Sequence, residues 1–439
     1  MRRQRAPVRA HAGRRTAVLV AATAALAALG GALFLASGTR LDFGAPDAQP
    51  LSYAELTGSV FLPLPKDPSR PPGVRELAVP SFPDATSVWG ATGRDPRGRI
   101  WVGVSARSSG MSAHLLQYDP GADAWHDRGA VVEQLKIAGL LRPGEGQVKI
   151  HSKIVTGADG WLYFASSDED GEDPGASRPP RWGGHLWRVH PDSHQWEHLL
   201  AVPEGLVAVS GVGRHVFALG YWGHVLYRHD TQTGASKRIV VGSTGGHVSR
   251  NFVADAAGHA YVPRLAPGAD GTLAATLVEY DSELRELAAT PLELYLGGGL
   301  SPADNHGIVG LAYLADGRLL FTTHRGQLYL IEPGGAAPSR VRALGWFHPG
   351  GEAYAPSLFA LGGPLVAGVT SRKGRYEWVV FEVRTTTGIA LPLETGGLQR
   401  LLLYGSISRD NAGRFYVGGW ASTGAGGQRP VVLQIGAGS

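Results

Sequence analysis

The chain has 439 residues, with 63 Gly, 29 Pro and no Cys. A hydrophobic content of 43% and a charged content of 18% are typical of globular proteins, which excludes wholesale disorder and a collagen-like chain. The lack of Cys excludes disulfides, thiolate metal sites and cysteine nucleophiles. Glycine is about twice as frequent as the usual ~7%, which indicates many tight turns and therefore an all-β fold.

The net charge of +4 comes from one end of the chain. Six Arg and no acidic residue precede residue 39, so the remainder holds 41 − 6 = 35 basic and 37 acidic residues, a balance of −2. A main domain without excess positive charge gives no reason to expect nucleic-acid binding.

The first residues predict an export signal. Residues 1–15 form a basic cytoplasmic region, and the uncharged residues 16–38 are long enough for a transmembrane anchor of ~20 residues. Small residues at 36–38 also fit a cleaved signal peptide, so both readings stay open. Either one places the rest of the chain outside the cytoplasm, periplasmic or extracellular. The Pro-rich residues 39–73 read as a linker.

Residues 74–439 contain seven copies of one unit, in which a turn ending in Gly is followed by an apolar strand. Clear copies include DPRGRIWVGV (95–104) and DNAGRFYVGG (410–419). The turn glycines are Gly98, Gly160, Gly213, Gly258, Gly317, Gly363 and Gly413.

An alternating strand follows each hairpin, at 114–120, 184–191, 223–230, 277–281, 326–333, 377–383 and 431–436. Fainter outer strands such as 236–242 complete the units. Four antiparallel strands repeated seven times predict a seven-bladed β-propeller. The last unit has no outer strand of its own, so we expect residues 74–79 to supply it and close the ring.

The D-x-x-G-x-aromatic-Val pattern resembles the seven-bladed propellers of the NHL, gluconolactonase-like and quinoprotein-like superfamilies. The resemblance covers about residues 74–439. It implies the architecture and no particular activity, because one fold carries many chemistries. The carboxylate and Asn metal set of gluconolactonases has no full match in this sequence.

The innermost strand of each blade lines the central channel, so the residues at its start are expected at the funnel mouth. Nine residues before each turn glycine stand Trp89, His151, Glu204, Ser249, Ile308, Tyr354 and Tyr404, with His247, Arg250 and His306 close by. This set is more polar than packing requires.

Two kinds of chemistry fit this set. His151, His247 and His306 could hold a divalent metal ion through neutral imidazoles. Alternatively, His151 and His247 act as acid and base, Arg250 neutralises a carboxylate, and Tyr354 or Tyr404 donates a hydrogen bond. Some polysaccharide lyases with this chemistry are propellers. A purely structural role for the histidines is the competing interpretation.

Loops on the same face carry further cations and aromatic rings suited to ligand binding. Together with Trp89 and Glu204, the predicted ligand-binding residues are Arg181, Trp182, Tyr221, Trp222 and Arg325. Arg forks bind carboxylate, sulfate or phosphate groups, and flat rings stack on sugars.

The sequence therefore predicts a membrane-anchored, extracytoplasmic propeller that binds an anionic carbohydrate-like ligand, with metal-assisted lyase or hydrolase activity left open. The alternative is a non-enzymatic extracytoplasmic scaffold that binds a protein partner.

Overall fold

The computed structural model describes residues 70–171, 178–221, 223–244, 249–268, 270–296, 307–424 and 426–436. These residues belong to the larger of two compact units, Leu51–Ser439. The predicted segments 1–15 and 16–38, and most of the linker 39–73, lie outside the described residues. Within the described ranges, no helix has the length and apolarity needed to cross a bilayer.

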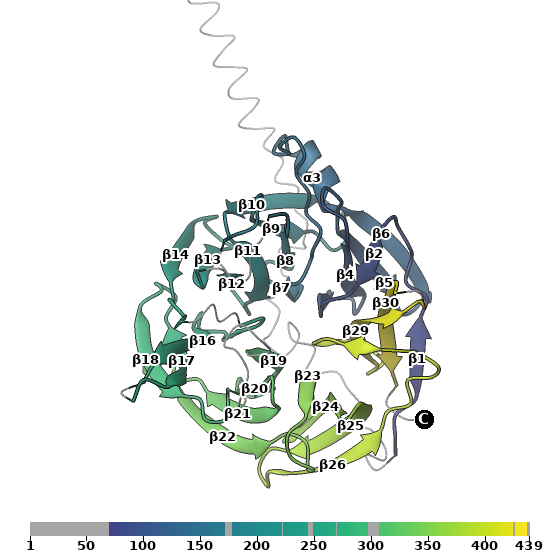
Figure 1. Ribbon diagram of the computed structural model, residues 1–439. Coiled ribbons are helices and arrows are strands. Elements are labelled where there is room, and N and C mark those ends of the chain that lie inside the picture. Colours follow the sequence, from purple (N-terminus) through teal and green to yellow (C-terminus); the bar gives the residue numbers. More distant parts are fainter. Residues whose placement is uncertain are drawn as a thin grey trace, which may run out of the picture. The chain divides into compact units, whose positions relative to one another are not determined.

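The described residues form seven antiparallel sheets set around a central axis, so the seven-bladed propeller is confirmed (Figure 1). From the axis outward, blade one is β2 (Ala85–Ser87) and β3 (Thr92–Arg94), β4 (Ile100–Ala106), β5 (His114–Asp119) and β6 (Ala124–Ala130). Blade two is β7 (Val155–Thr156), β8 (Leu162–Ser167), β9 (Gly184–Val189) and β10 (Trp196–Val202). Blade three is β11 (Gly205–Ser210), β12 (His215–Tyr221), β13 (Val225–Asp230) and β14 (Ser236–Val240). Blade four is β15 (Val253–Ala254), β16 (Ala260–Pro267), β17 (Leu273–Tyr280) and β18 (Glu286–Pro291).

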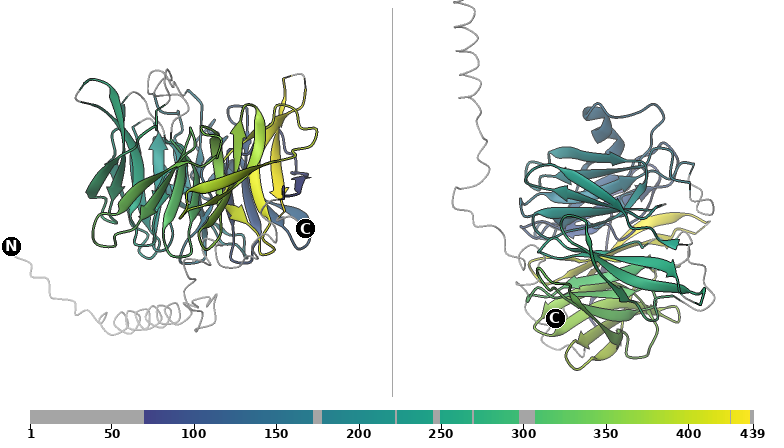
Figure 2. Two further views of the ribbon diagram at one scale, coloured as in Figure 1. Left: turned by 90° about the horizontal axis from the view of Figure 1, so that it is seen from below. Right: turned by 90° about the vertical axis from the view of Figure 1, so that its left-hand side faces the viewer.

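The remaining blades follow the same order. Blade five is β19 (Ile308–Tyr313), β20 (Leu319–Thr323), β21 (Gln327–Glu332) and β22 (Arg340–Trp346). Blade six is β23 (Tyr354–Gly362), β24 (Leu365–Arg372), β25 (Arg375–Glu382) and β26 (Thr387–Pro392). Blade seven is β27 (Leu402–Leu403) and β28 (Ser408–Arg409), β29 (Phe415–Ser422), β30 (Gln428–Ile435) and β1 (Val74–Leu77). The strands run across the thickness of the ring (Figure 2).

The first described strand closes the ring, as predicted. β1 pairs antiparallel with β30, with Val74 opposite Ile435 and Leu77 opposite Val432. Figure 1 shows β1 in purple beside the yellow strands of blade seven. Chain segments from both ends of the sequence therefore share one sheet.

The hydrophobic core is divided among the junctions between blades. The buried apolar residues of the described chain form seven clusters, and each cluster is drawn mainly from two neighbouring blades. One cluster joins blades seven and one through Leu77, Val102, Tyr118 and Val432. Because inner strands are covered on both faces, they read as continuous apolar runs, as in β19 and β11.

The repeated turn has a structural explanation. All seven predicted turn glycines have a positive φ, between 53° and 107°, which glycine adopts without strain. In D-x-x-G copies, the Asp carboxylate accepts hydrogen bonds from its own turn and from the aromatic side chain six residues later. The three pairs are Asp95 with Trp101 Nε1 (3.0 Å), Asp255 with Tyr261 Oη (2.8 Å) and Asp410 with Tyr416 Oη (2.7 Å).

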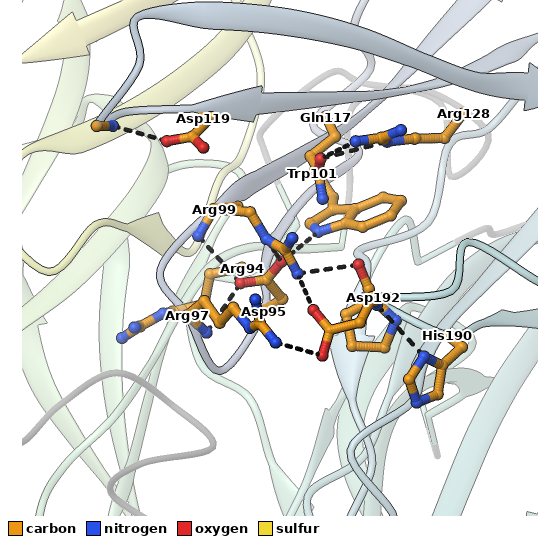
Figure 3. Close-up of polar contacts among 12 residues, drawn as sticks. Arg94, Asp95, Arg97, Arg99, Trp101, Gln117, Asp119, Arg128, His190 and Asp192 are labelled. Atoms are coloured by element: carbon orange, nitrogen blue, oxygen red, sulfur yellow. Dashed lines mark hydrogen bonds and ion pairs between the residues drawn. The ribbon is translucent and has the colours of Figure 1, made fainter. Parts of the chain in front are cut away.

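Asp95 shows the full arrangement (Figure 3). One carboxylate oxygen accepts from the amides of Arg97 and Arg99, and the other accepts from Arg99 Nε at 2.6 Å and from Trp101. The carboxylate is buried and fully hydrogen-bonded within its own turn. The motif that suggested the fold is thus a device that fixes the turn to the next strand.

We expect Asp410→Ala to lower the free energy of unfolding by about 2–4 kcal/mol, because Arg414, Tyr416 and two turn amides lose a buried acceptor. Urea denaturation would measure the loss. Asp316→Ala is the matched control, since this turn carboxylate is exposed and its side-chain partner is the neighbouring Arg318. For Asp316→Ala we expect the free energy of unfolding to fall by less than about 1 kcal/mol. Equal losses in the two variants would contradict the role given to the buried turn Asp.

Candidate functional site

In every blade, the innermost strand begins on one side of the ring, here called the entry face, and ends at the glycine turn on the other side, the turn face. At the entry face, Trp89, His151 and Tyr404 come from blades one, two and seven. The rings of Trp89 and Tyr404 lie 4.7 Å apart between centroids, and those of Trp89 and His151 lie 6.4 Å apart and stacked. These residues, with Tyr354 and Arg250, are named the entry cluster.

Arg250 carries a positive charge that acts on the three titratable side chains of the entry cluster besides its own. Its charge lowers the pKa of His151 and opposes the rise in the pKa of Tyr354 and of Tyr404. The side chain is exposed, and within the described ranges its guanidinium makes no hydrogen bond or ion pair. The charge of Arg250 therefore acts on His151, Tyr354 and Tyr404, and the roles predicted for these residues stay predictions.

His151 is held as a neutral imidazole. Its Nδ1 lies 2.9 Å from the Val207 carbonyl oxygen, to which it donates a hydrogen bond. Burial, followed by the charges of Arg250 and Lys149, holds the pKa of His151 well below its usual value. A neutral ring at neutral pH fits a hydrogen-bonding or ligand role better than a proton donor.

The two tyrosines stay protonated. Burial is the largest cause that raises the pKa of Tyr354 and of Tyr404. The neighbouring phenols of Tyr404 and Tyr376 raise the pKa of Tyr354 further. The Tyr354 ring also lies 4.9 Å from the ring of His324, one of the entry-face loop residues. Both phenols are thus hydrogen-bonding groups across the physiological pH range.

Two lysines beside His151 were missed by sequence reasoning. Lys149 lies over the Trp89 ring at 4.9 Å and forms an ion pair with Glu169. Lys153 is buried, and its Nζ donates to the carbonyl oxygens of Gly90 at 3.0 Å and Gly405 at 2.6 Å. The spacing K-x-H-x-K from 149 to 153 was the available signal, because alternate residues of an extended segment share one face.

Lys153 joins three blades at the channel axis. It starts in blade two and reaches carbonyls of blades one and seven, while no carboxylate lies within ion-pair distance in the described chain. Burial lowers the pKa of Lys153 to about 7. A Cβ added to Gly405 would meet Lys153 Nζ at 2.9 Å and the Val309 carbonyl at the same distance, so the backbone crowds this side chain.

Other predicted ligand-binding residues have partners outside the entry cluster. Glu204 accepts a hydrogen bond from Tyr227 Oη at 2.6 Å, on the third strand of blade three. Arg325 is paired with Glu352 at 2.6 Å. The Tyr221 ring lies against Gly205, where an added Cβ would come within 2.2 Å of it. Each of these side chains already has a partner within the described chain.

Arg181 and Trp182 form a separate group near the helix α3 (Val131–Ile137), which follows blade one. The guanidinium carbons of Arg181 and Arg142 lie 4.6 Å and 4.9 Å from the Trp182 ring centroid. Arg142 also pairs with the buried Glu145 at 2.9 Å. This stack and the exposed Ile137 and Leu140 form what we call the α3 rim.

The metal site stays a prediction. His247, His306 and the predicted ligand-binding Trp222 lie outside the described residues, and only His151 of the three proposed metal ligands lies inside them. Among the described residues, no group of three or more His, Asp or Glu side chains is arranged to hold a metal ion.

No protein-family model matches the chain, and no curated protein matches it either. Many solved structures share the fold. YCF48 bound to a D1 peptide is 12% identical, with a TM-score of 0.45, and the match covers 85% of this chain and 98% of that one. A protein of unknown function from Dyadobacter fermentans is 12% identical, with a TM-score of 0.49 and coverage of 83% and 99%.

TolB from Acinetobacter baumannii is 14% identical, with a TM-score of 0.36 and coverage of 74% of this chain and 76% of that one. At these identities the likeness concerns the fold alone. The resemblance to NHL, gluconolactonase-like and quinoprotein-like propellers therefore stays a prediction, whereas the seven-bladed propeller is established by the sheets themselves.

Proposed function

We propose that this chain is a non-enzymatic binding propeller, which takes an acidic segment of a protein partner at its entry face. The observation that supports the proposal most is Arg250, an exposed guanidinium without a hydrogen bond or ion pair in the described chain, whose charge acts on His151 and Tyr404 of the entry cluster. Arg and large aromatic side chains are the residues that dominate binding energy at protein interfaces.

The protonation states favour binding over acid–base catalysis. A general acid or base works best with a pKa near the working pH. The pKa of His151 is pushed well below its usual value and that of Tyr354 is raised, so neither group is poised to exchange a proton near pH 7. The lyase or hydrolase reading of the sequence has no matching acid–base pair among the described entry-cluster residues.

The α3 rim favours a protein over an oligosaccharide. Ile137 and Leu140 are 71% and 44% exposed, and they precede Arg142 in the chain, which stacks on Trp182. Exposed aliphatic side chains next to an Arg–Trp stack provide the apolar contact that a protein surface offers and a charged sugar does not. The extracytoplasmic location, which rests on residues 1–38 alone, is part of this proposal.

Fluorescence anisotropy with labelled acidic peptides, run beside uronate oligosaccharides, would test the proposal on the full chain. We expect an acidic peptide containing an aromatic residue to bind in a salt-sensitive way, and Arg250→Ala to weaken it about tenfold or more. Arg375→Ala is the matched control, because this Arg is exposed on an entry-face hairpin and is not a member of the entry cluster. Binding of the oligosaccharide alone, or its cleavage, would show that the protein-binding proposal is wrong.

A further inference from the structure

We propose that the turn-face end of the central channel is a binding site for a short monocarboxylate anion, held by Arg94 and Arg409. This site lies at the opposite end of the innermost strands from the entry cluster, and it does not depend on the function proposed above. The two arginines end β3 and β28, the innermost strands of blades one and seven.

Both guanidinium groups are buried and have most of their donors unused. Arg94 is 9% exposed and Arg409 is 5% exposed. Each guanidinium has five N–H donors. Among the described residues, Arg94 donates only from Nη2, to Asn411 Oδ1 at 2.6 Å, and Arg409 donates only from Nη1, to the Ala360 carbonyl. The Nε atoms of both side chains are buried without any partner.

No carboxylate of the described chain neutralises this pair. The acidic groups whose charges act on the pair are Asp95, which acts on Arg94, and Asp410, which acts on both Arg94 and Arg409. Both carboxylates, however, are used by their own turns, in bonds to Arg99 and Trp101 and to Arg414 and Tyr416. Two buried cations on adjacent blades therefore lack an ion-pair partner among the described residues, and this arrangement is stabilised when an anion binds to both of them.

A cavity of about 50 Å³ adjoins the two guanidinium groups, and Arg94 and Arg409 both line it. A single water needs roughly 10–15 Å³ on the same measure, so the space holds a few heavy atoms. Its other walls are mainly apolar and include Val212, Leu311 and Phe359, with Thr156 as a polar member. A guanidinium fork binds a carboxylate through two parallel hydrogen bonds, and apolar walls suit a one- or two-carbon tail. Acetate and propionate have this shape and polarity.

The electrostatics of the pair agree with the geometry. Burial, followed by the positive charge of Arg94, lowers the pKa of Arg409 to about 9 against the opposing charge of Asp410. Burial also lowers the pKa of Arg94. A bound carboxylate offsets the free-energy cost of burying the two charged guanidinium groups. The same ligand is therefore expected to stabilise the folded chain.

Isothermal titration calorimetry on the full chain, at constant ionic strength, tests the site with sodium acetate, sodium chloride and neutral acetamide. We expect acetate to bind at one site and to raise the thermal midpoint, chloride to bind at least tenfold more weakly, and acetamide not to bind. Equal binding of acetate and chloride, binding of acetamide, or no binding at all would overturn the proposal.

The variant Arg409→Met should weaken acetate binding about tenfold or more. Arg97→Met is the matched control, because Arg97 lies on the turn after β3 but is exposed and paired with Asp192. If Arg409→Met does not fold, as judged by circular dichroism, Arg409→Lys can replace it. This variant keeps the positive charge but lacks the two-pronged guanidinium group, so it should still bind acetate more weakly than the wild-type chain. Equal weakening by Arg97→Met would mean that general surface charge binds the anion, and the assigned site would be wrong.

Discussion

We expect the free energy of unfolding of the wild-type chain to increase between pH 7 and pH 9, and we expect this increase to be absent in the variant Lys153→Met. Burial lowers the pKa of Lys153 from 10.5 to about 7. In that pH range the unfolded chain keeps the proton on this amine, whereas the folded chain releases it. The unfolded state then binds more protons, so the free energy of unfolding increases with pH.

The size of this effect follows from the shift. For a Lys153 pKa of about 7 in the folded state, the free energy of unfolding of the wild-type chain increases by about 2 kcal/mol between pH 7 and pH 9. Urea unfolding at several pH values would measure it. Lys136→Met, on the exposed side of α3, is the matched control and should retain the wild-type slope. If Lys153→Met kept the same slope, the burial-driven shift assigned to this lysine would be contradicted.

The variant Leu77→Asp should destabilise the whole propeller, with a loss of about 4 kcal/mol or more. Leu77 is 4% exposed and packs in the cluster that joins blades seven and one. The substitution removes a core side chain and puts a carboxylate in its place, and both changes oppose closure of the ring. The midpoint of thermal unfolding would fall accordingly.

Glu76→Gln provides the comparison for that variant, because Glu76 neighbours Leu77 on β1 and points its carboxylate to the exposed Arg429. A surface ion pair contributes roughly 0–1 kcal/mol, so little change is expected. A loss below about 1 kcal/mol for Leu77→Asp would mean that β1 does not hold the ring closed.

Repetition made the fold predictable. Turn glycines at Gly98, Gly258 and Gly413 marked the hairpins, and the deficit of one strand at the C-terminus predicted the role of residues 74–79. Because the same pattern occurs in seven copies, the boundaries of a blade with a weak copy can be inferred from the blades with clear copies. The buried turn carboxylates explain why the pattern is so regular.

The site was only partly predictable, because counting along a strand gives the position of a residue in that strand but not the burial or the partners of its side chain. Counting nine residues back from each turn placed Trp89, His151 and Tyr404 together, and the ring contacts confirm that they are neighbours. The same count places Glu204 directly before β11, but it does not reveal that the side chain reaches Tyr227 in the third strand.

Lys153 and Arg409 escaped prediction for a related reason. A charged residue in a strand is ordinarily read as facing solvent, since burying an unpaired charge is costly. Around a propeller axis, however, the residues of seven strands converge, and a long side chain can end among backbone carbonyls, as Lys153 does. Such burial depends on several blades at once and leaves no pattern within one of them.

The closure through β1 and β30 also has a mechanical consequence. Because Val74 lies opposite Ile435 in antiparallel register, a force that separates the two ends of the propeller pulls on adjacent strands of a single sheet. The hydrogen bonds between these strands would then break one after another, as in a zipper, and not all together. Under tension between its two ends, the ring should therefore open at blade seven while the other six blades remain folded.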